Sequence, residues 1–271
     1  MNLTETVAYE PAPVKTIDQV ISELNSIIEN ALQTNNAAGY FAVLYKKVTV
    51  KVKEGIENHF FDDCVRMEKL DIVFARRYID AYFCWQKNEV VAQSWEKAFI
   101  SLKNKNMLVL QHLLMGMNAH INLDLGIAAA EISTRENIHL LKNDFIKINQ
   151  ILSSLVDDVQ YGLSAIWPGL KWLLSKSGKL DNYLVDFSME IARDGAWNFA
   201  TEIVQYKDKD WLGQIKIRDL KVAEKTKIIT HPGKWIQFLF WFIRLGEKGS
   251  VSEKMNRLNL ITKENTDLKT E

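Results

Sequence analysis

The residues best suited to chemistry lie in one long apolar stretch, residues 107–131. Four of them follow one another at intervals of four residues: His112, Gly116, His120 and Asp124. At about 100° per residue, these positions drift slowly round one side of a helix, so His120 and Asp124 can touch. A carboxylate beside an imidazole fixes the tautomer and the orientation of the ring. The pair is therefore a candidate acid and base, with His112 as a third catalytic candidate.

The same side of this helix could instead hold a metal ion. Imidazole and carboxylate groups are common ligands of zinc and iron. A divalent zinc or iron ion is therefore a candidate cofactor, with His112, His120 and Asp124 as its ligands. Gly116 leaves a gap one turn before His120, which suits either a close helix crossing or a small ligand.

Two amides lie on nearly the opposite side of the stretch, Asn118 and Asn122. Burying so many polar groups on one helix costs stability unless each group is hydrogen-bonded. We expect the two amides to bond to a neighbouring helix. A purely structural reading of the whole stretch, in which every polar group is satisfied in this way, stays open.

Two other segments offer partners for this site. In residues 74–85, Arg76 and Asp80 are one turn apart, and Arg77 lies next to an aromatic side that includes Tyr78. In residues 189–200, Asp194 and Trp197 share a helix face with Glu190. The predicted binding residues are Arg76, Arg77, Tyr78, Asp80, Asn118, Asn122, Asp194 and Trp197. The sequence cannot show whether the three helices meet.

The long segments repeat their apolar residues at a period near 3.6, which predicts an all-α fold. We expect a single large multi-helix domain over residues 16–246, packed as a bundle around the buried stretch 107–131. Residues 1–15 are predicted to be a flexible arm and residues 247–271 a frayed tail. Residues 48–52 carry alternating valines and could form a strand instead. Residues 211–227 read as an irregular or short helical connection.

One predicted helix, residues 235–245, is apolar except for Gln237 and Arg244. On a helical wheel these two residues fall on one narrow stripe. The helix is therefore either buried with one wet edge or directed at a partner or a membrane surface.

Composition narrows the classes of function. Lys plus Arg and Asp plus Glu both number 34, so the formal net charge is zero and nothing indicates a nucleic-acid partner. The two cysteines match no zinc or redox spacing. No signal peptide, transmembrane segment, phosphate-binding loop or hydrolase motif is visible, so we expect a cytoplasmic protein.

Three segments together carry a family resemblance. They are HLLMGMNAHINLDLGIAAA, EKLDIVFARRYIDAY before it and ARDGAWNFA after it. They resemble a bacterial family of helical proteins known as a domain of unknown function, number fifty-nine ninety-five. The likeness covers roughly residues 40–206, and NAHIN-x-DL at residues 118–125 is its most specific part. The resemblance implies an all-α fold and brings no assigned activity.

A weaker analogy links the chain to zinc-dependent phospholipases C and single-strand nucleases. These proteins are also all-helical and take His and Asp ligands from several helices, a part that His112, His120 and Asp124 would play. Their N-terminal Trp ligand and export signal are missing, and Met117 stands where they have an Asp after Gly.

Two functional hypotheses follow, from different classes. The first is a hydrolase that uses the polar cluster on the central helix, either to bind a divalent metal ion or as acid and base. The second is a binding protein for an apolar or lipid-like small ligand, in which residues 74–85 and 235–245 line a pocket and the polar cluster fixes the head group.

Overall fold

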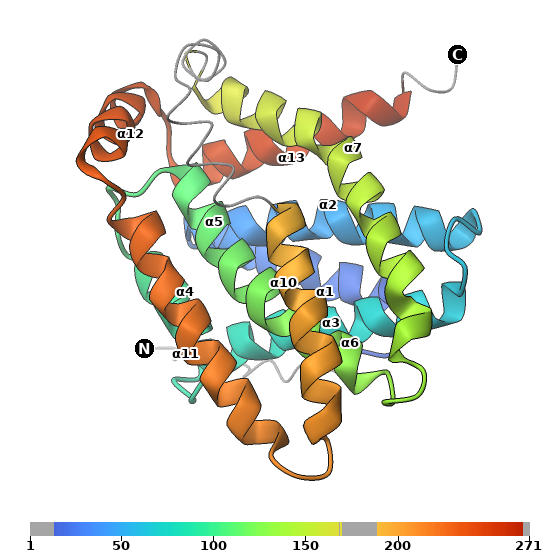
Figure 1. Cartoon of the computed structure of the whole chain (residues 1–271). Helices are drawn as coiled ribbons and strands as arrows, with labels where there is room; N and C mark the ends of the chain where they lie inside the picture. The colour runs from blue at the N-terminus through green and yellow to red at the C-terminus, as the bar shows by residue number, and fades with distance from the viewer. Residues whose placement is uncertain (1–13, 168, 170–188, 268–271) are drawn as a thin grey trace, which may run out of the picture.

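The computed structural model describes residues 14–167, 169 and 189–267, and every regular element in these ranges is a helix (Figure 1). In chain order these are α1 (Ile17–Gln33), α2 (Ala38–Glu57), α3 (Cys64–Gln86), α4 (Gln93–Ser101), α5 (Val109–Ala119), η1 (His120–Asp124), α6 (Leu125–Glu131), η2 (Ile138–Leu141), α7 (Lys142–Ile166), α10 (Met189–Ile203), η3 (Val204–Tyr206), α11 (Trp211–Thr230), α12 (Lys234–Gly246) and α13 (Val251–Asp267). The predicted all-α fold is confirmed. Within these ranges no helix is both long enough and apolar enough to cross a membrane.

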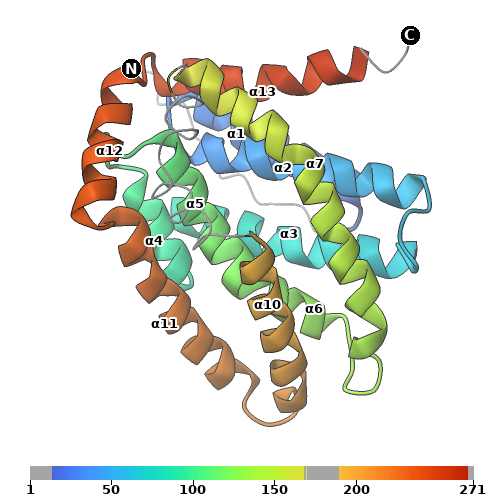
Figure 2. The same cartoon turned by 45° about the horizontal axis from the view of Figure 1, so that its top comes forward.

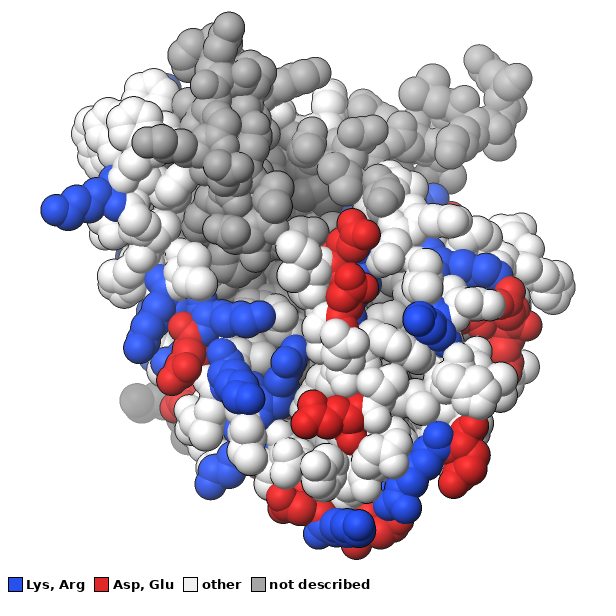
Figure 3. All heavy atoms as spheres, viewed as in Figure 1, with Lys and Arg blue, Asp and Glu red and all other residues white. Residues whose placement is uncertain are grey.

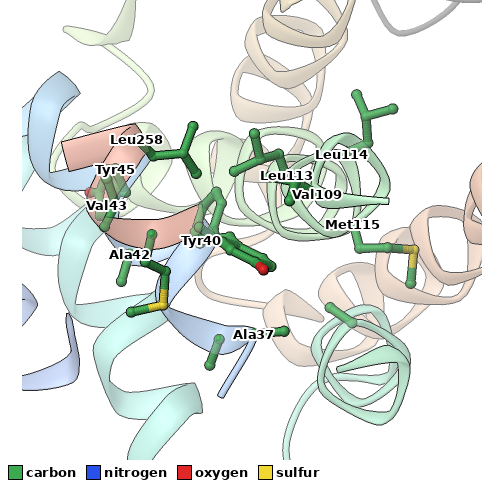
Figure 4. Packing of buried hydrophobic residues seen from close by; sticks show 14 of the residues in the cluster. Ala37, Tyr40, Ala42, Val43, Tyr45, Val109, Leu113, Leu114, Met115 and Leu258 are labelled. Atoms are coloured by element: carbon green, nitrogen blue, oxygen red, sulfur yellow. The ribbon is translucent and has the colours of Figure 1, made fainter. Parts of the chain in front are cut away.

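Helices α5, η1 and α6 form one continuous rod through the middle of the molecule, and Figures 1 and 2 show neighbours on all sides of it. α5 packs against α2, α4 and α11, and α6 packs against α3 and α10. Figure 4 shows Tyr40 of α2 beside Leu113 of α5 at one end of this core. The rod is buried almost throughout, because apolar residues occur all round it.

Local signals explain where several helices begin. Thr16 caps α1, accepting a bond from Gln19 N while the Gln19 side chain bonds back to the Thr16 backbone. Asp63 caps α3 in the same way, because its side chain accepts a bond from Arg66 N. Residues 48–52 are helical, because Thr49 and Val52 share the buried face of α2.

Two predictions about irregular structure are wrong. Residues 211–227 lie in the regular helix α11, whose buried stripe is narrow and is interrupted by Thr226. The predicted frayed tail contains α13, which packs on α1, α2 and α7. Met255 and Leu258 are buried there, and the Met255 sulfur lies against Gly39, where a side chain would leave no room. The two buried residues, one turn apart, hold α13 against the neighbouring helices.

Other predictions fall outside the described residues. These are the arm up to residue 13, a short helix at 170–174 and the first part of a helix predicted from residue 180. From residue 189 onward that last helix is present as α10, and it ends in the tight turn η3.

Charged side chains of both signs are interspersed on the face that carries α10 and α11 (Figure 3). This agrees with the zero formal net charge.

The crossing of α6 and α10 is close enough to require glycine at one position. A Cβ on Gly126 would lie 2.8 Å from the Ala196 carbonyl oxygen and 2.9 Å from Phe199 Cδ1. A Cβ on Gly195 of α10 would meet only the Arg218 Nη2 atom, at 3.5 Å. We therefore expect Gly126→Ala to lower the free energy of unfolding by about 1–3 kcal/mol. Gly195→Ala should be neutral or stabilise by up to about 1 kcal/mol, because alanine favours a helix.

Urea denaturation of both variants measures this difference. If both variants change stability equally, the α6–α10 crossing is not the constraint that the contact distances indicate.

Candidate functional site

The central rod changes its winding at the most specific part of the sequence motif. Residues His120–Asp124 form a π-helix, in which the Leu125 N–H donates to the His120 carbonyl five residues earlier. Such widened turns are rare and concentrate at functional sites. The Asn122 carbonyl within this turn accepts a hydrogen bond from Arg218 Nε of α11 at 2.9 Å. A backbone group displaced by the wider turn is thus satisfied from a neighbouring helix.

Asp124 gathers three partners from three elements. Its Oδ2 lies 3.2 Å from His120 Nδ1 and accepts from Trp95 Nε1 of α4 at 2.8 Å. Its Oδ1 accepts from Arg77 Nε of α3 at 2.9 Å. The Asp124 side chain is 1% exposed and that of Arg77 is 27% exposed. The predicted contact between His120 and Asp124 is confirmed, and Arg77 joins it.

The surroundings set the charge state of the pair. Burial alone would raise the pKa of Asp124, but Arg77 and the bonds from His120 and Trp95 outweigh it, so this pKa lies below its ordinary value. Burial lowers the pKa of His120, and the bond to Asp124 opposes this only in part. At neutral pH His120 is therefore uncharged. Its Nδ1–H then donates to the Asp124 carboxylate, and Nε2 carries the lone pair.

Aromatic rings enclose the His120 imidazole. The ring of Phe74 stacks on it with centroids 3.6 Å apart, and Tyr45 meets it edge-on at 4.4 Å. Further rings stand at 5.8 to 6.1 Å, from Phe41, Trp95 and Tyr78. Phe74 is half-buried, whereas Tyr45 is buried. Phe74 therefore covers His120 on the side nearer to solvent.

Three buried polar atoms around this site have no hydrogen-bond partner among the described residues. They are His120 Nε2, the Tyr45 hydroxyl and Asp71 Oδ2. Burial, followed by the charge of Asp71, raises the pKa of Tyr45, so these two groups are close enough to interact. Buried polar groups in proteins are nearly always paired. The unpartnered His120 Nε2, the Tyr45 hydroxyl beside this ring and Asp71 near Tyr45 therefore mark a candidate site.

The structure adds two residues to the candidate site, Tyr45 and Asp71, and Asp71 is the more unusual of them. Burial and the charge of Glu68 raise its pKa to about 7. Neither Asp71 nor Tyr45 was among the predicted site residues. The signal for Asp71 was its place in an otherwise apolar run, Leu70-Asp71-Ile72-Val73. Tyr45 offered no such signal, because a tyrosine on an apolar helix face is ordinary core.

The model of a family of unknown function, DUF5995, matches residues 17–232 of this chain. The chain belongs to this family. The matched range contains the π-helix and the cluster around His120, and it ends before α12 and α13. Comparisons with curated proteins and with solved structures gave no match.

The structure does not bring His112 to the pair formed by His120 and Asp124. His112 lies two turns before His120, about 12 Å along the helix. Its ring lies 5.9 Å from that of Tyr40, and burial, with Lys254 and Arg244, lowers its pKa to about 4. The structure therefore places His112 apart from His120 and Asp124.

Of the predicted binding residues, Arg77 and Tyr78 converge on the site. Arg76 and Asp80 form an exposed ion pair at 3.8 Å. Asp194 is exposed on α10, and Trp197 packs on Phe145 of α7.

The two asparagines bond to a neighbouring helix, as predicted. Asn118 Nδ2 donates to the Val222 carbonyl at 3.0 Å, and Lys225 Nζ donates to Asn122 Oδ1 at 3.3 Å. The gap at Gly116 is filled by a helix crossing, because a Cβ there would lie 2.5 Å from the Phe41 ring.

The predicted zinc or iron site does not fit these residues. Among the described residues, no group of three His, Cys, Asp or Glu side chains could hold a metal ion. Both oxygens of Asp124 are occupied by Arg77, Trp95 and His120. The analogy to zinc-dependent phospholipases therefore finds no ligand set here.

Proposed function

We propose that the protein is an enzyme that uses His120 as a general base, with hydrolysis of a small substrate as the reaction class. The observation that carries this proposal is the asymmetry of the imidazole. Nδ1 is bonded to Asp124, and Nε2 is buried without a partner among the described residues. A neutral imidazole fixed in this tautomer can take a proton from water at Nε2, and the carboxylate then stabilises the imidazolium that forms.

The other orphan groups supply the complementary chemistry. The Tyr45 hydroxyl stays protonated, because burial raises its pKa well above the ordinary value. Asp71 carries a proton on part of the molecules at neutral pH. The Tyr45 O–H beside the base, with the carboxyl group of Asp71 near Tyr45, would hold and polarise a substrate oxygen while His120 activates water. Arg77 would act indirectly, by keeping Asp124 ionised.

Access to His120 would depend on Phe74. Its ring lies parallel to the imidazole and is half-buried. A rotation of this one side chain would expose the imidazole, and rotamer changes of this kind are fast compared with most enzymatic turnover.

A second candidate rests on the aromatic enclosure itself. Rings from three helices around a few polar atoms also suit a binding protein for an apolar or lipid-like ligand, whose head group would bond to His120 and Asp71. This candidate predicts a bound ligand and no turnover.

The test is hydrolysis of a panel of carboxylic ester, phosphoester and amide substrates by the wild type, His120→Gln and His112→Gln. His112 is the matched control, because it is also buried on the rod with an unpartnered ring nitrogen, yet lies outside the cluster. We expect activity in the wild type and in His112→Gln, and none in a folded His120→Gln. Equal activity in all three would remove His120 from the mechanism. An inactive wild type with an apolar ligand seen by native mass spectrometry would favour the binding protein.

A further inference from the structure

Helix α12 has two apolar faces that point in opposite directions. Its inner face is buried in the main core and consists of Ile236, Leu239, Phe240 and Ile243. Its outer face consists of Phe238, Trp241, Phe242 and Leu245, which are 45% to 59% exposed. At about 100° per residue the two groups occupy separate halves of the helix. Of the two alternatives that the sequence left open, burial with one wet edge does not describe the outer half of this helix.

The outer residues form one continuous strip. The rings of Phe238 and Trp241 stack 6.0 Å apart, and Trp235, itself 51% exposed, lies 5.9 Å from Phe238. From Trp235 to Leu245 the strip is about 15 Å long. In Figures 1 and 2, α12 forms an outer edge of the molecule. A contiguous aromatic surface of this kind marks an interaction site rather than scattered exposed residues.

The exposed charged residues within residues 231–249 have one sign. Residues 231–249 contain a single acidic residue, Glu247, which is 5% exposed and pairs with Lys254 at 3.2 Å. Lys234 and Lys248 are exposed at the two ends of the helix. The exposed residues Lys103 and Lys105 lie on an adjacent loop, where the Lys105 carbonyl accepts a bond from Arg244 at 2.6 Å. A strip of Trp and Phe with a basic border matches the interface of an anionic bilayer, where aromatic rings lie at the head-group level.

We propose that α12 docks the protein on an anionic membrane surface, with its outer aromatic residues between the lipid head groups. The helix has 13 residues, too few to span a bilayer, so it lies in the plane of the interface. The zero net charge of the whole chain does not oppose this, because attraction to a membrane falls off within a Debye length and depends on the charges next to the surface. The proposal does not depend on the reaction assigned to His120.

The test is co-sedimentation of the full chain with phosphatidylcholine vesicles, with and without phosphatidylserine. Phe238→Gln/Trp241→Gln removes the centre of the strip. Val90→Gln/Leu212→Gln is the matched control, because these residues are 98% and 77% exposed elsewhere on the molecule. Lys234→Gln/Lys248→Gln tests the basic border.

We expect the wild type and the control to bind the anionic vesicles. The aromatic variant should bind at least about tenfold more weakly, and the lysine variant should lose the preference for phosphatidylserine. The proposal is overturned if the wild type stays in the supernatant, or if the aromatic variant binds as the control does. It is also overturned if size-exclusion chromatography shows a wild-type dimer that the aromatic variant converts to a monomer, because the strip is then a contact between two copies.

Discussion

Replacing Asp124 with alanine should lower the free energy of unfolding by about 3–5 kcal/mol, a large part of the stability of a domain this size. The carboxylate is buried and accepts from Arg77 Nε and Trp95 Nε1 as well as bonding His120. Its removal leaves a partly buried guanidinium without its counter-charge and two ring nitrogens without their partner. Stranding a buried charge costs far more than losing an exposed one.

Two further variants show whether the loss of stability is specific to the buried Asp124 carboxylate or would follow from removing a carboxylate elsewhere. Asp80→Ala on α3 breaks an exposed pair with Arg76 at 3.8 Å, and should cost less than about 1 kcal/mol. Asp124→Asn keeps one acceptor oxygen but no charge, so it should fall between the two. Urea denaturation monitored by tryptophan fluorescence measures all three. A loss for Asp124→Ala no larger than that for Asp80→Ala would show that the carboxylate does not hold α3, α4 and the π-helix together.

The sequence was sufficient to locate the site but not to complete it. The interval of four residues placed His120 beside Asp124, because side chains at that interval meet on any helix. The interval of eight residues to His112 was misleading. Residues eight apart share a side of the helix, but they are also about 12 Å apart along its axis. Arg77 could be named as a candidate but not distinguished from Arg76. Only the rotation of α3 against the rod decides which of two adjacent arginines faces inward.

The π-helix shows a different limit of periodicity. The sequence around His120 reads as ordinary helix. In the structure, the Asn122 carbonyl of the widened turn accepts a bond from Arg218 of α11, nearly a hundred residues later, and no local pattern reveals such a partner. Tyr45 and Asp71 were missed for a related reason. Each is buried on its own helix. The significance of Tyr45 comes from its contact with His120 on the central rod, and that of Asp71 from its interaction with Tyr45.

The outer parts of the chain were harder to predict than the core. α13 has a weak apolar pattern, yet it packs on α1, α2 and α7, with Met255 against Gly39. α12 has a strong apolar pattern, and half of it is exposed. Hydrophobic periodicity therefore predicted helices well, but it could not tell a face that packs on the protein from a face that packs on something else.

The second large effect is a gain in the free energy of unfolding, whereas the first is a loss. Asp71→Asn should stabilise the protein by about 2–4 kcal/mol at about pH 8 and change little at about pH 4. Burial, with Glu68, raises the pKa of Asp71 to about 7 from an ordinary value of 3.8. The folded state keeps this proton up to about pH 7, whereas the unfolded state releases it near pH 4. Stability from this group is thus complete below about pH 4 and is lost as the pH rises to about 7, by about 4 kcal/mol in total. Asparagine stays neutral and avoids that loss.

Asp144→Asn is the matched control, because Asp144 is equally buried but fully satisfied. Its two oxygens accept from the backbone N–H groups of Asp62 and Asp63, at 2.6 and 2.9 Å. The same substitution there should destabilise by about 1–3 kcal/mol at both pH values. Urea denaturation at the two pH values measures both variants. If Asp71→Asn destabilises the protein at about pH 8, the ionised carboxylate of Asp71 is stabilised by a partner in the folded protein.

A stabilising Asp71→Asn would also bear on function. A carboxyl group that costs the fold several kcal/mol at neutral pH is retained where it has a task, and such residues trade stability for activity. If Asp71 positions a substrate oxygen opposite His120, the variant that gains stability should lose hydrolysis, while Asp144→Asn should lose stability and keep it. If Asp71 belongs to a catalytic cluster, its replacement should raise stability and lower hydrolysis. If Asp71 is ordinary core, stability and hydrolysis should change in the same direction.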